Sequence, residues 1–267
     1  LDFPDLGVDG TFPLGAAVTA VLLTRGVNPL ATLAAAMAAG ALAGLFTGVV
    51  HVCLKVRNLL AGIITMTALF SINLQIAGSN LTVDRSVETI FTASWAESAL
   101  GGLNLMERKL VISLVLVIVV KLALDLYFKT KSGLLLRAVG DNDVLVTSLA
   151  KDKGMVKIVG LAIANGFAAL AGAVYCQQKG FFEISVGTGT IVIGLANVII
   201  GTQLFKRIGF VKSTTAVIIG SIVYKACVSF AISCGMEAND LKLVTAVLFL
   251  IILVLSNDRR KKVKAHA

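Results

Sequence analysis

Residues 110–128 read LVISLVLVIVVKLALDLYF, with Lys121 and Asp125 as the only charged residues. An apolar run of about 20 residues can cross the hydrocarbon core of a bilayer as one α-helix. The whole chain shares this character, since 57% of its 267 residues are hydrophobic and only 15% are charged. This composition excludes an ordinary soluble domain, a disordered chain and a disulfide-framed secreted module. The sequence therefore indicates a membrane protein.

Other long apolar runs lie at 30–54, 59–77, 156–176, 190–205, 210–233 and 241–256. Long unbroken runs are typical of membrane helices and exclude an outer-membrane β-barrel, whose strands alternate. The run 12–24 is short, so a re-entrant helix and a full crossing both stay open. In 190–205, Gly194 and Gly201 would suit a bent or interrupted helix. The predicted fold is an all-α, polytopic transmembrane helix bundle of about 7–9 membrane segments, some short or broken.

The charged residues that give the net charge of +9 are predicted to divide between the two sides of the membrane. Strict alternation of the seven clear spans places the basic clusters on one side, which is then the cytoplasm. These clusters are Lys55 with Arg57, the loop 129–157, Lys206 with Arg207 and Lys212, and the tail 257–267. The opposite side receives Asp84, Glu88, Glu97, Glu237 and Asp240. The tail is thus interpreted as a basic cytoplasmic tail that can contact membrane lipid, and nucleic acid is not expected as a partner.

Small residues predict how the helices pack. Ala36, Gly40, Gly44 and Gly48 recur every four residues, which predicts one tight helix contact. A second small face begins at Ala162 and Gly166, is interrupted by the bulky Leu170, and continues at Ala169 and Ala173.

Polar groups within the spans need a partner or a water-lined path. Thr67, Ser71 and Gln75 share one helix face, and Asn73 lies near the outer end of the same span. The predicted translocation pathway consists of Thr67, Ser71, Asn73, Gln75, Asn165 and Asn197. Hydrogen bonding between helices is the alternative for each of them.

Ionisable groups in the spans have structural explanations as well. Lys121 and Asp125 are one helical turn apart, so they can neutralise each other. Lys225 has no acidic neighbour at helical spacing. It can extend to the membrane surface, contact a partner chain, or meet an anionic substrate.

The loop 129–157 breaks the pattern. Gly140, Asp141 and Asn142 predict a turn and helix cap, and a short helix with an apolar face should follow and end at Gly154. Such a helix can lie on the bilayer or insert into a groove of a cytoplasmic partner.

Several of these residues carry a resemblance to a known family. Gly133, Arg137-Ala138, the Asp and Asn cluster and Gly154, followed by a span that ends in Ala171-Gly172-Ala173, resemble the cytoplasmic loop of permeases of branched-chain amino acid and sugar-type ABC importers. The opening LDFPDLGVDGTFPLGAA is similar to a subgroup described as tryptophan/tyrosine permeases. In that family a helix precedes this opening motif, which implies that an N-terminal helix is missing here.

The resemblance implies one transmembrane permease domain over 1–267, multi-pass in the bacterial plasma (inner) membrane. It further implies a homodimer of permeases, with ATPase subunits in the cytoplasm and a substrate-binding protein outside. Residues 142–151 would form the coupling helix in the ATPase groove. The implied ATPase contacts are Arg137, Asp141, Asn142, Val144, Leu145, Ser148, Leu149 and Lys151.

The chain shows no phosphate-binding loop, because its Gly187-Thr-Gly189-Thr segment lacks the required lysine. No catalytic or metal site is expected, and ATP and Mg²⁺ would sit on the partner ATPase. The expected function is that of a permease subunit of an ATP-driven importer for a small solute. The expected solute is an amino acid, and more specifically an aromatic amino acid. The alternative is an ion-coupled secondary transporter that uses Lys121, Asp125 and Lys225.

Overall fold

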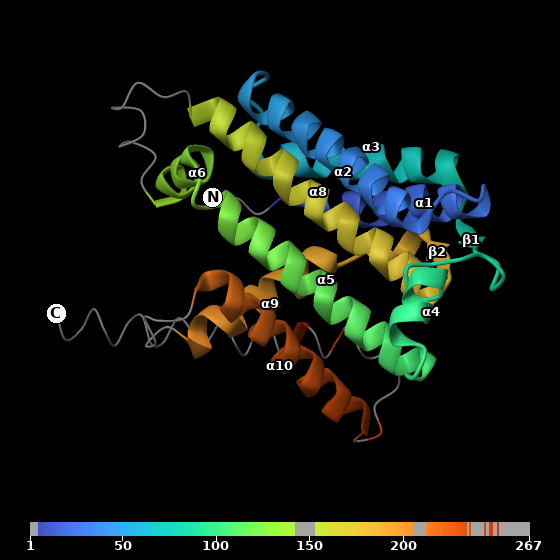
Figure 1. Ribbon diagram of the computed structural model, residues 1–267. Helices are drawn as coiled ribbons and strands as arrows, with labels where there is room; N and C mark the ends of the chain where they lie inside the picture. Colours follow the sequence, from blue (N-terminus) through green and yellow to red (C-terminus); the bar gives the residue numbers. More distant parts are fainter. Residues whose placement is uncertain are drawn as a thin grey trace. The chain divides into compact units, whose positions relative to one another are not determined.

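Helices dominate the computed structural model of the chain (Figure 1). The structure describes residues 5–141, 153–205 and 212–233, together with Gly235, Leu243, Ala246, Val247 and Leu250. Within these residues, six helices are long and apolar enough to cross a membrane, by length and composition. The prediction of an all-α, polytopic helix bundle is confirmed. Contacts divide the chain into two compact units, Leu1–Thr188 and Gly189–Ala267.

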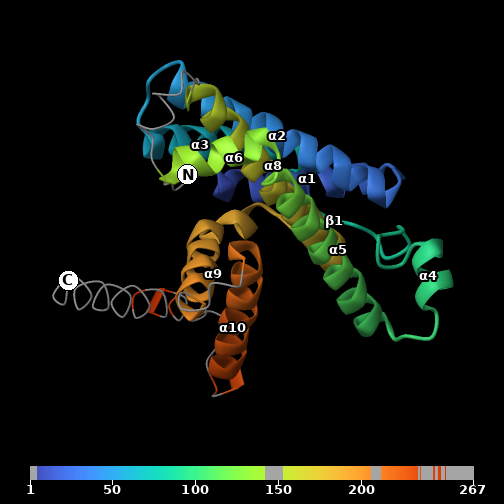
Figure 2. The ribbon, with the colours of Figure 1, turned by 60° about the vertical axis from the view of Figure 1, so that its left-hand side comes forward.

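The long helices of the first unit are α1 (Val8–Thr24), α2 (Pro29–Val52), α3 (Asn58–Ala77), α5 (Leu105–Tyr127) and α8 (Lys153–Lys179). Helix α8 packs along α1 and α2, and α1 also contacts α2 and α3 (Figures 1 and 2). Helix α1 is therefore enclosed by three others. It begins earlier than the predicted run 12–24, yet its 17 residues still fall short of the about 20 that a full crossing needs.

The small-residue face predicted on α2 is confirmed as a tight contact, and its partner is α8. A Cβ atom on Gly40 would lie 2.5 Å from the backbone oxygen of Asn165, and one on Gly48 would lie 2.8 Å from Cα of Ile158. Because these distances leave no room for a side chain, the two backbones approach closely.

Helices α1 and α8 also touch backbone to backbone. A Cβ atom on Gly172 of α8 would collide with the backbone oxygen of Phe12, and one on Gly15 of α1 would lie 2.5 Å from the carbonyl carbon of Ala169. Ala169 belongs to the second predicted small face, which therefore packs on α1 as well as on α2.

A small polar segment closes one end of this unit. Strand β1 (Asn80–Thr82) pairs antiparallel with β2 (Phe181–Glu183), and the 3₁₀-helix η1 (Ile184–Gly187) follows. The short helix α4 (Ser94–Leu100) precedes α5. This end lies opposite to α6 (Lys131–Asp141), as the distribution of charges predicts (Figures 1 and 2).

Helix α6 corrects one expectation for the loop. The predicted turn at Gly140 and Asp141 is wrong, because both residues are helical. Leucines and an alanine favour a helix here, and Val139 is buried against the unit. Residues 142–152, which include the whole predicted coupling helix 142–151, lie outside the described residues.

The second unit contains α9 (Thr190–Leu204) and α10 (Ser213–Ser233), which pack on each other. The expected bend at Gly194 and Gly201 is wrong, because α9 is continuous across both. Gly201 instead provides a close approach, since a Cβ atom there would lie 2.6 Å from the carbonyl carbon of Ala216. The interruption precedes the helix at Gly189, whose φ of +84° favours glycine. The predicted span 241–256 lies outside the continuous described ranges.

Candidate functional site

The polar residues of α3 divide between two faces. Thr67, Ser71 and Gln75 are exposed on one face, as predicted. The packing face is formed by the buried residues Ala61, Gly62, Thr65, Leu69 and Asn73. Asn73 is fully buried, and its amide Nδ2 donates a hydrogen bond of 3.1 Å to the backbone oxygen of Gly10. The structure therefore brings three of the four predicted α3 residues together and places Asn73 against α1.

The exposed face of Thr67, Ser71 and Gln75 is called the polar stripe below. At a rise of about 1.5 Å per residue it spans roughly 12 Å, from near the end of α3 at Ala77 to the middle of the helix. The Thr67 hydroxyl donates 2.9 Å to the backbone oxygen of Ile63. Hydroxyl and amide groups in this position can offer donors and acceptors to water or to a polar solute.

Asn165, predicted to line the pathway, is fully buried in α8. Its Nδ2 donates 2.7 Å to Asp5 Oδ2 and 3.0 Å to the backbone oxygen of Leu161, and its Oδ1 accepts 2.9 Å from the Thr11 hydroxyl. Sequence reasoning missed Asp5, although a carboxylate beside an apolar helix start was a usable signal. Every polar group of the Asn165 side chain is occupied inside this unit, and its pathway role stays a prediction.

The second unit contains Asn197 and Lys225. Asn197 is half-buried on α9, and its Oδ1 is buried without a hydrogen-bond partner. Such an atom normally binds water or a ligand. Lys225 is exposed on α10.

The predicted ATPase contacts are described only in part. Arg137 is exposed on α6, and its guanidinium carbon lies 4.8 Å from the ring centroid of Phe128. Asp141 is the last residue of α6. The others stay predictions outside the described residues: Asn142, Val144, Leu145, Ser148, Leu149 and Lys151.

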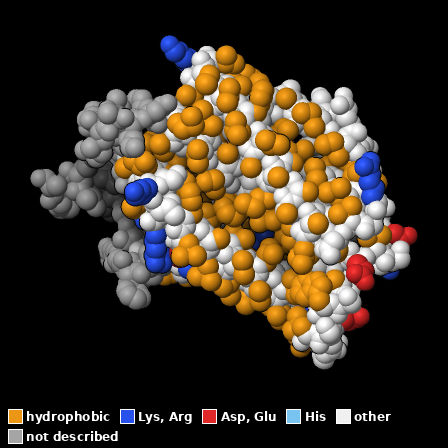
Figure 3. All heavy atoms as spheres, turned by 45° about the horizontal axis from the view of Figure 1, so that its top comes forward, with side chains coloured by type: hydrophobic (Ala, Val, Ile, Leu, Met, Phe, Trp, Pro, Cys, Tyr) orange, Lys and Arg blue, Asp and Glu red, His pale blue; other side chains and the backbone are white. Residues whose placement is uncertain are grey.

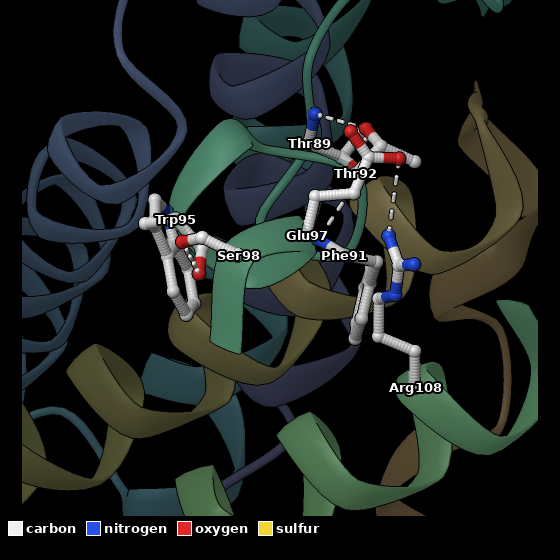
Figure 4. Close-up of polar contacts among 7 residues, drawn as sticks. All are labelled: Thr89, Phe91, Thr92, Trp95, Glu97, Ser98 and Arg108. Atoms are coloured by element: carbon white, nitrogen blue, oxygen red, sulfur yellow. Dashed lines mark hydrogen bonds and ion pairs between the residues drawn. The ribbon is translucent and has the colours of Figure 1, made fainter. Parts of the chain in front are cut away.

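Two ion pairs are seen among the described residues. Lys121 Nζ lies 3.2 Å from Asp125 Oδ2, which confirms the predicted neutralisation within α5. At the opposite end of the unit from α6, Arg108 lies 3.5 Å from Glu97, whose side chain is 68% exposed (Figure 4). The Arg108 side chain is only 9% exposed, but the exposed carboxylate of Glu97 leaves the pair screened by solvent, so it contributes little to stability.

The segment 78–104 presents acidic groups. Hydrogen bonds from the backbone N–H and hydroxyl of Ser86 lower the pKa of Asp84 below its usual value, so this carboxyl stays ionised. The space-filling view shows acidic side chains at one edge of a largely apolar face (Figure 3).

Gln177, which sequence reasoning also missed, fastens this segment. It is 3% exposed, and its Oε1 accepts a 2.8 Å hydrogen bond from the backbone N–H of Ile90. Its Nε2 donates 3.0 Å to both the backbone oxygen of Pro29 and the hydroxyl of Thr32. One amide therefore joins the end of α8 to the start of α2 and to the segment.

Comparison with known proteins identifies the family. The family model for the permease component of branched-chain amino acid transport systems matches residues 2–255. The chain belongs to this permease family. The resemblance found in the sequence is confirmed, and the permease is a multi-pass membrane protein that acts as a component of a transport system.

Two of three curated relatives match nearly the whole permease. It is 40% identical over 257 residues to the tyrosine transport system permease protein of Clostridioides difficile (strain R20291), which covers 96% of this chain and 83% of the relative. An uncharacterized protein of Rickettsia prowazekii (strain Madrid E) is 31% identical, covering 95% and 88%. The autoinducer 2 import system permease protein LsrC of Salmonella paratyphi B (strain ATCC BAA-1250 / SPB7) is 28% identical, covering 74% and 54%. No solved structure gives a significant match.

Proposed function

We propose that this permease is the membrane subunit of an ATP-driven ABC importer in a bacterial plasma membrane. It acts as a homodimer, with ATPase subunits on the cytoplasmic side and a substrate-binding protein outside. Its substrate is an amino acid, and an aromatic one such as tyrosine. The family match and the 40% identity to a permease named for tyrosine transport support this proposal.

The polar stripe is the observation that supports the proposed location of the translocation pathway. Thr67, Ser71 and Gln75 face away from the packed side of a membrane-spanning helix and are exposed. Polar groups that face hydrocarbon are costly, so this face borders either a water-filled path or another protein surface. In the proposed homodimer, it lines the path of the amino acid.

Alanine at Thr67, Ser71 and Gln75 together is expected to lower transport about tenfold or more, because up to three hydrogen bonds of about 1 kcal/mol each are lost along the path. Uptake of labelled tyrosine into proteoliposomes that contain permease, ATPase and binding protein measures this. The matched control is alanine at Ile64 and Ile72, which are exposed apolar residues of α3. Unchanged uptake and unchanged substrate-stimulated ATP hydrolysis in the triple variant would contradict the pathway.

Contact with the ATPase is tested by cross-linking. Cysteine introduced by Leu145→Cys or Ser148→Cys is expected to cross-link to the ATPase in the assembled complex and to block uptake, because the coupling helix would be fixed in its groove. Cysteine at the exposed position Met106, near the opposite end of α5 from α6, is the control and should not cross-link. Equal cross-linking at both places would count against the assignment.

Ion-coupled transport is the competing function. Lys121 and Asp125 already pair within α5, which leaves the exposed Lys225 as its best coupling group. Vesicles that contain the permease alone and accumulate tyrosine under an ion gradient without ATP would establish this alternative.

A further inference from the structure

A buried carboxylate lies at the start of α1. Asp5 is only 8% exposed, and its two oxygens accept 2.8 Å from the backbone N–H of Gly7 and 2.7 Å from Nδ2 of Asn165. No lysine or arginine among the described residues forms an ion pair with it. Its charge is instead offset by amide donors and by the positive end of α1.

The partner of this carboxylate connects two helices at one point. The Oδ1 atom of Asn165 accepts a hydrogen bond from the hydroxyl of Thr11, which lies in the first turn of α1. Its Nδ2 atom donates to Asp5, which lies just before α1. Helix α3 closes the other side, since a Cβ atom on Gly62 would lie 3.1 Å from Asp5 Oδ1 and 2.8 Å from the backbone nitrogen of Leu6. Asp5, Thr11 and Asn165 are called the α1–α8 latch.

The latch differs in kind from the other contacts between α1 and α8. Gly15 and Gly172 let the two backbones touch, but such small-residue surfaces are smooth and act through non-directional van der Waals forces. Hydrogen bonds between Asp5, Asn165 and Thr11 are directional, and those to the carboxylate are charge-assisted. The latch therefore fixes the axial position and rotation of α1 against α8.

The position of the latch along α8 connects α1 to the end of α8 that follows the predicted coupling helix. Helix α8 begins at Lys153, directly after the segment 142–151 assigned to the ATPase groove. Asn165 lies about 18 Å further along the helix at about 1.5 Å per residue. A displacement of the beginning of α8 is thus carried by a rigid helix to the start of α1.

We propose that Asp5 and Asn165 are positioning residues for transport, which make α1 follow α8 when the ATPase moves the loop before it. This inference rests on the proposed ATP-driven import. Both residues are buried and bonded within the first unit, so this role acts through the position of α1 rather than through contact with the substrate. Their loss is expected to uncouple ATP hydrolysis from uptake rather than simply to weaken the fold.

An exchange of donor and acceptor tests the latch. In D5N one accepting oxygen becomes an NH2 group, so either the N–H of Gly7 or Nδ2 of Asn165 loses its acceptor. In N165D two carboxylates face each other. Either variant should lower the tyrosine moved per ATP hydrolysed by at least about fivefold, the low end of typical coupling energies. The double variant D5N/N165D restores one donor opposite one acceptor and should return the ratio to within about twofold of the unmodified protein. The ratio is measured in proteoliposomes with ATPase and binding protein present.

The amount of assembled complex and its melting temperature are measured in parallel. If these residues only stabilise the fold, their substitution would lower the amount of complex, the ATP hydrolysis and the uptake together. The ratio of tyrosine moved to ATP hydrolysed would then stay unchanged, which would overturn the proposal. A double variant no better than the single variants would overturn it as well. If the single variants do not assemble, T11V decides. It removes the hydroxyl that donates 2.9 Å to Asn165 Oδ1 and 3.4 Å to the backbone oxygen of Val8, with little change of shape, and it should still lower the ratio. Absence of ATP-driven uptake by the unmodified complex would instead reject the proposed function.

Discussion

Gly172→Ala is expected to disrupt the packing of α1 on α8, with one of the largest effects of any single methyl group added to the first unit. The new Cβ atom would collide with the backbone oxygen of Phe12 and lie 2.9 Å from its carbonyl carbon. Neither is the end of a flexible side chain, so a whole helix must shift. We expect a loss of about 3 kcal/mol or more in the free energy of unfolding, the upper range for overpacked cores. Melting temperature and yield of monodisperse protein in detergent measure this.

Two other glycines supply controls for this substitution. Gly166→Ala adds a methyl group to the same helix, where its nearest neighbour is the backbone oxygen of Met37 at 3.3 Å. Gly194→Ala adds one to α9, where nothing lies within 4 Å. Gly194→Ala should stay close to the unmodified protein, and Gly166→Ala, which requires a shift of only a few tenths of an ångström, should lose far less stability than Gly172→Ala. Equal stability of the Gly172 and Gly166 variants would show that α1 and α8 do not approach as closely as described.

Gln177→Leu is the second substitution with a large expected effect. It leaves the buried N–H of Ile90 without an acceptor and removes the donor shared by Thr32 and Pro29. A buried donor without a partner costs about 1–3 kcal/mol, so a loss of about 2–3 kcal/mol is expected. The segment 78–104 should also become more sensitive to limited proteolysis, because its attachment to α8 is broken.

The neighbouring glutamine is a matched control. Gln178 is exposed, and its contact with Lys109 is made by its backbone oxygen, so Gln178→Leu retains that contact. Its melting temperature and proteolysis pattern should match those of the unmodified protein. If both leucine variants behave alike, the amide of Gln177 does not fasten the segment.

Local patterns in the sequence predicted the features that depend on residue spacing within one helix. The four-residue repeat of Gly40, Gly44 and Gly48 predicted a tight contact, and Thr67, Ser71 and Gln75 do share an exposed face of α3. Both follow from helical periodicity alone. The identity of the partner helix did not follow, because α8 lies more than a hundred residues further along the chain.

The missed features depend on distant contacts. Asp5 and Asn165 are 160 positions apart, and Gln177 and Ile90 are 87 apart, so no spacing rule relates them. The glycines of α9 led to a wrong prediction, because they suggested a bend where the helix is continuous. Glycine permits both a bend and a close approach, and only the presence of α10 beside Gly201 decides between them. Helix α6 was missed because the glycine and acidic residues at its end also suit a turn.

The separation of α1 and α8 along the chain has a consequence for biosynthesis. Asp5 and Thr11 leave the ribosome long before Asn165, the residue that satisfies both. At about 5–20 residues per second, the delay is roughly 8–30 s. During that interval, the start of α1 has no access to its native partner. Until α8 is made, the polar groups of Asp5 and Thr11 must therefore be satisfied by water or by the insertion machinery.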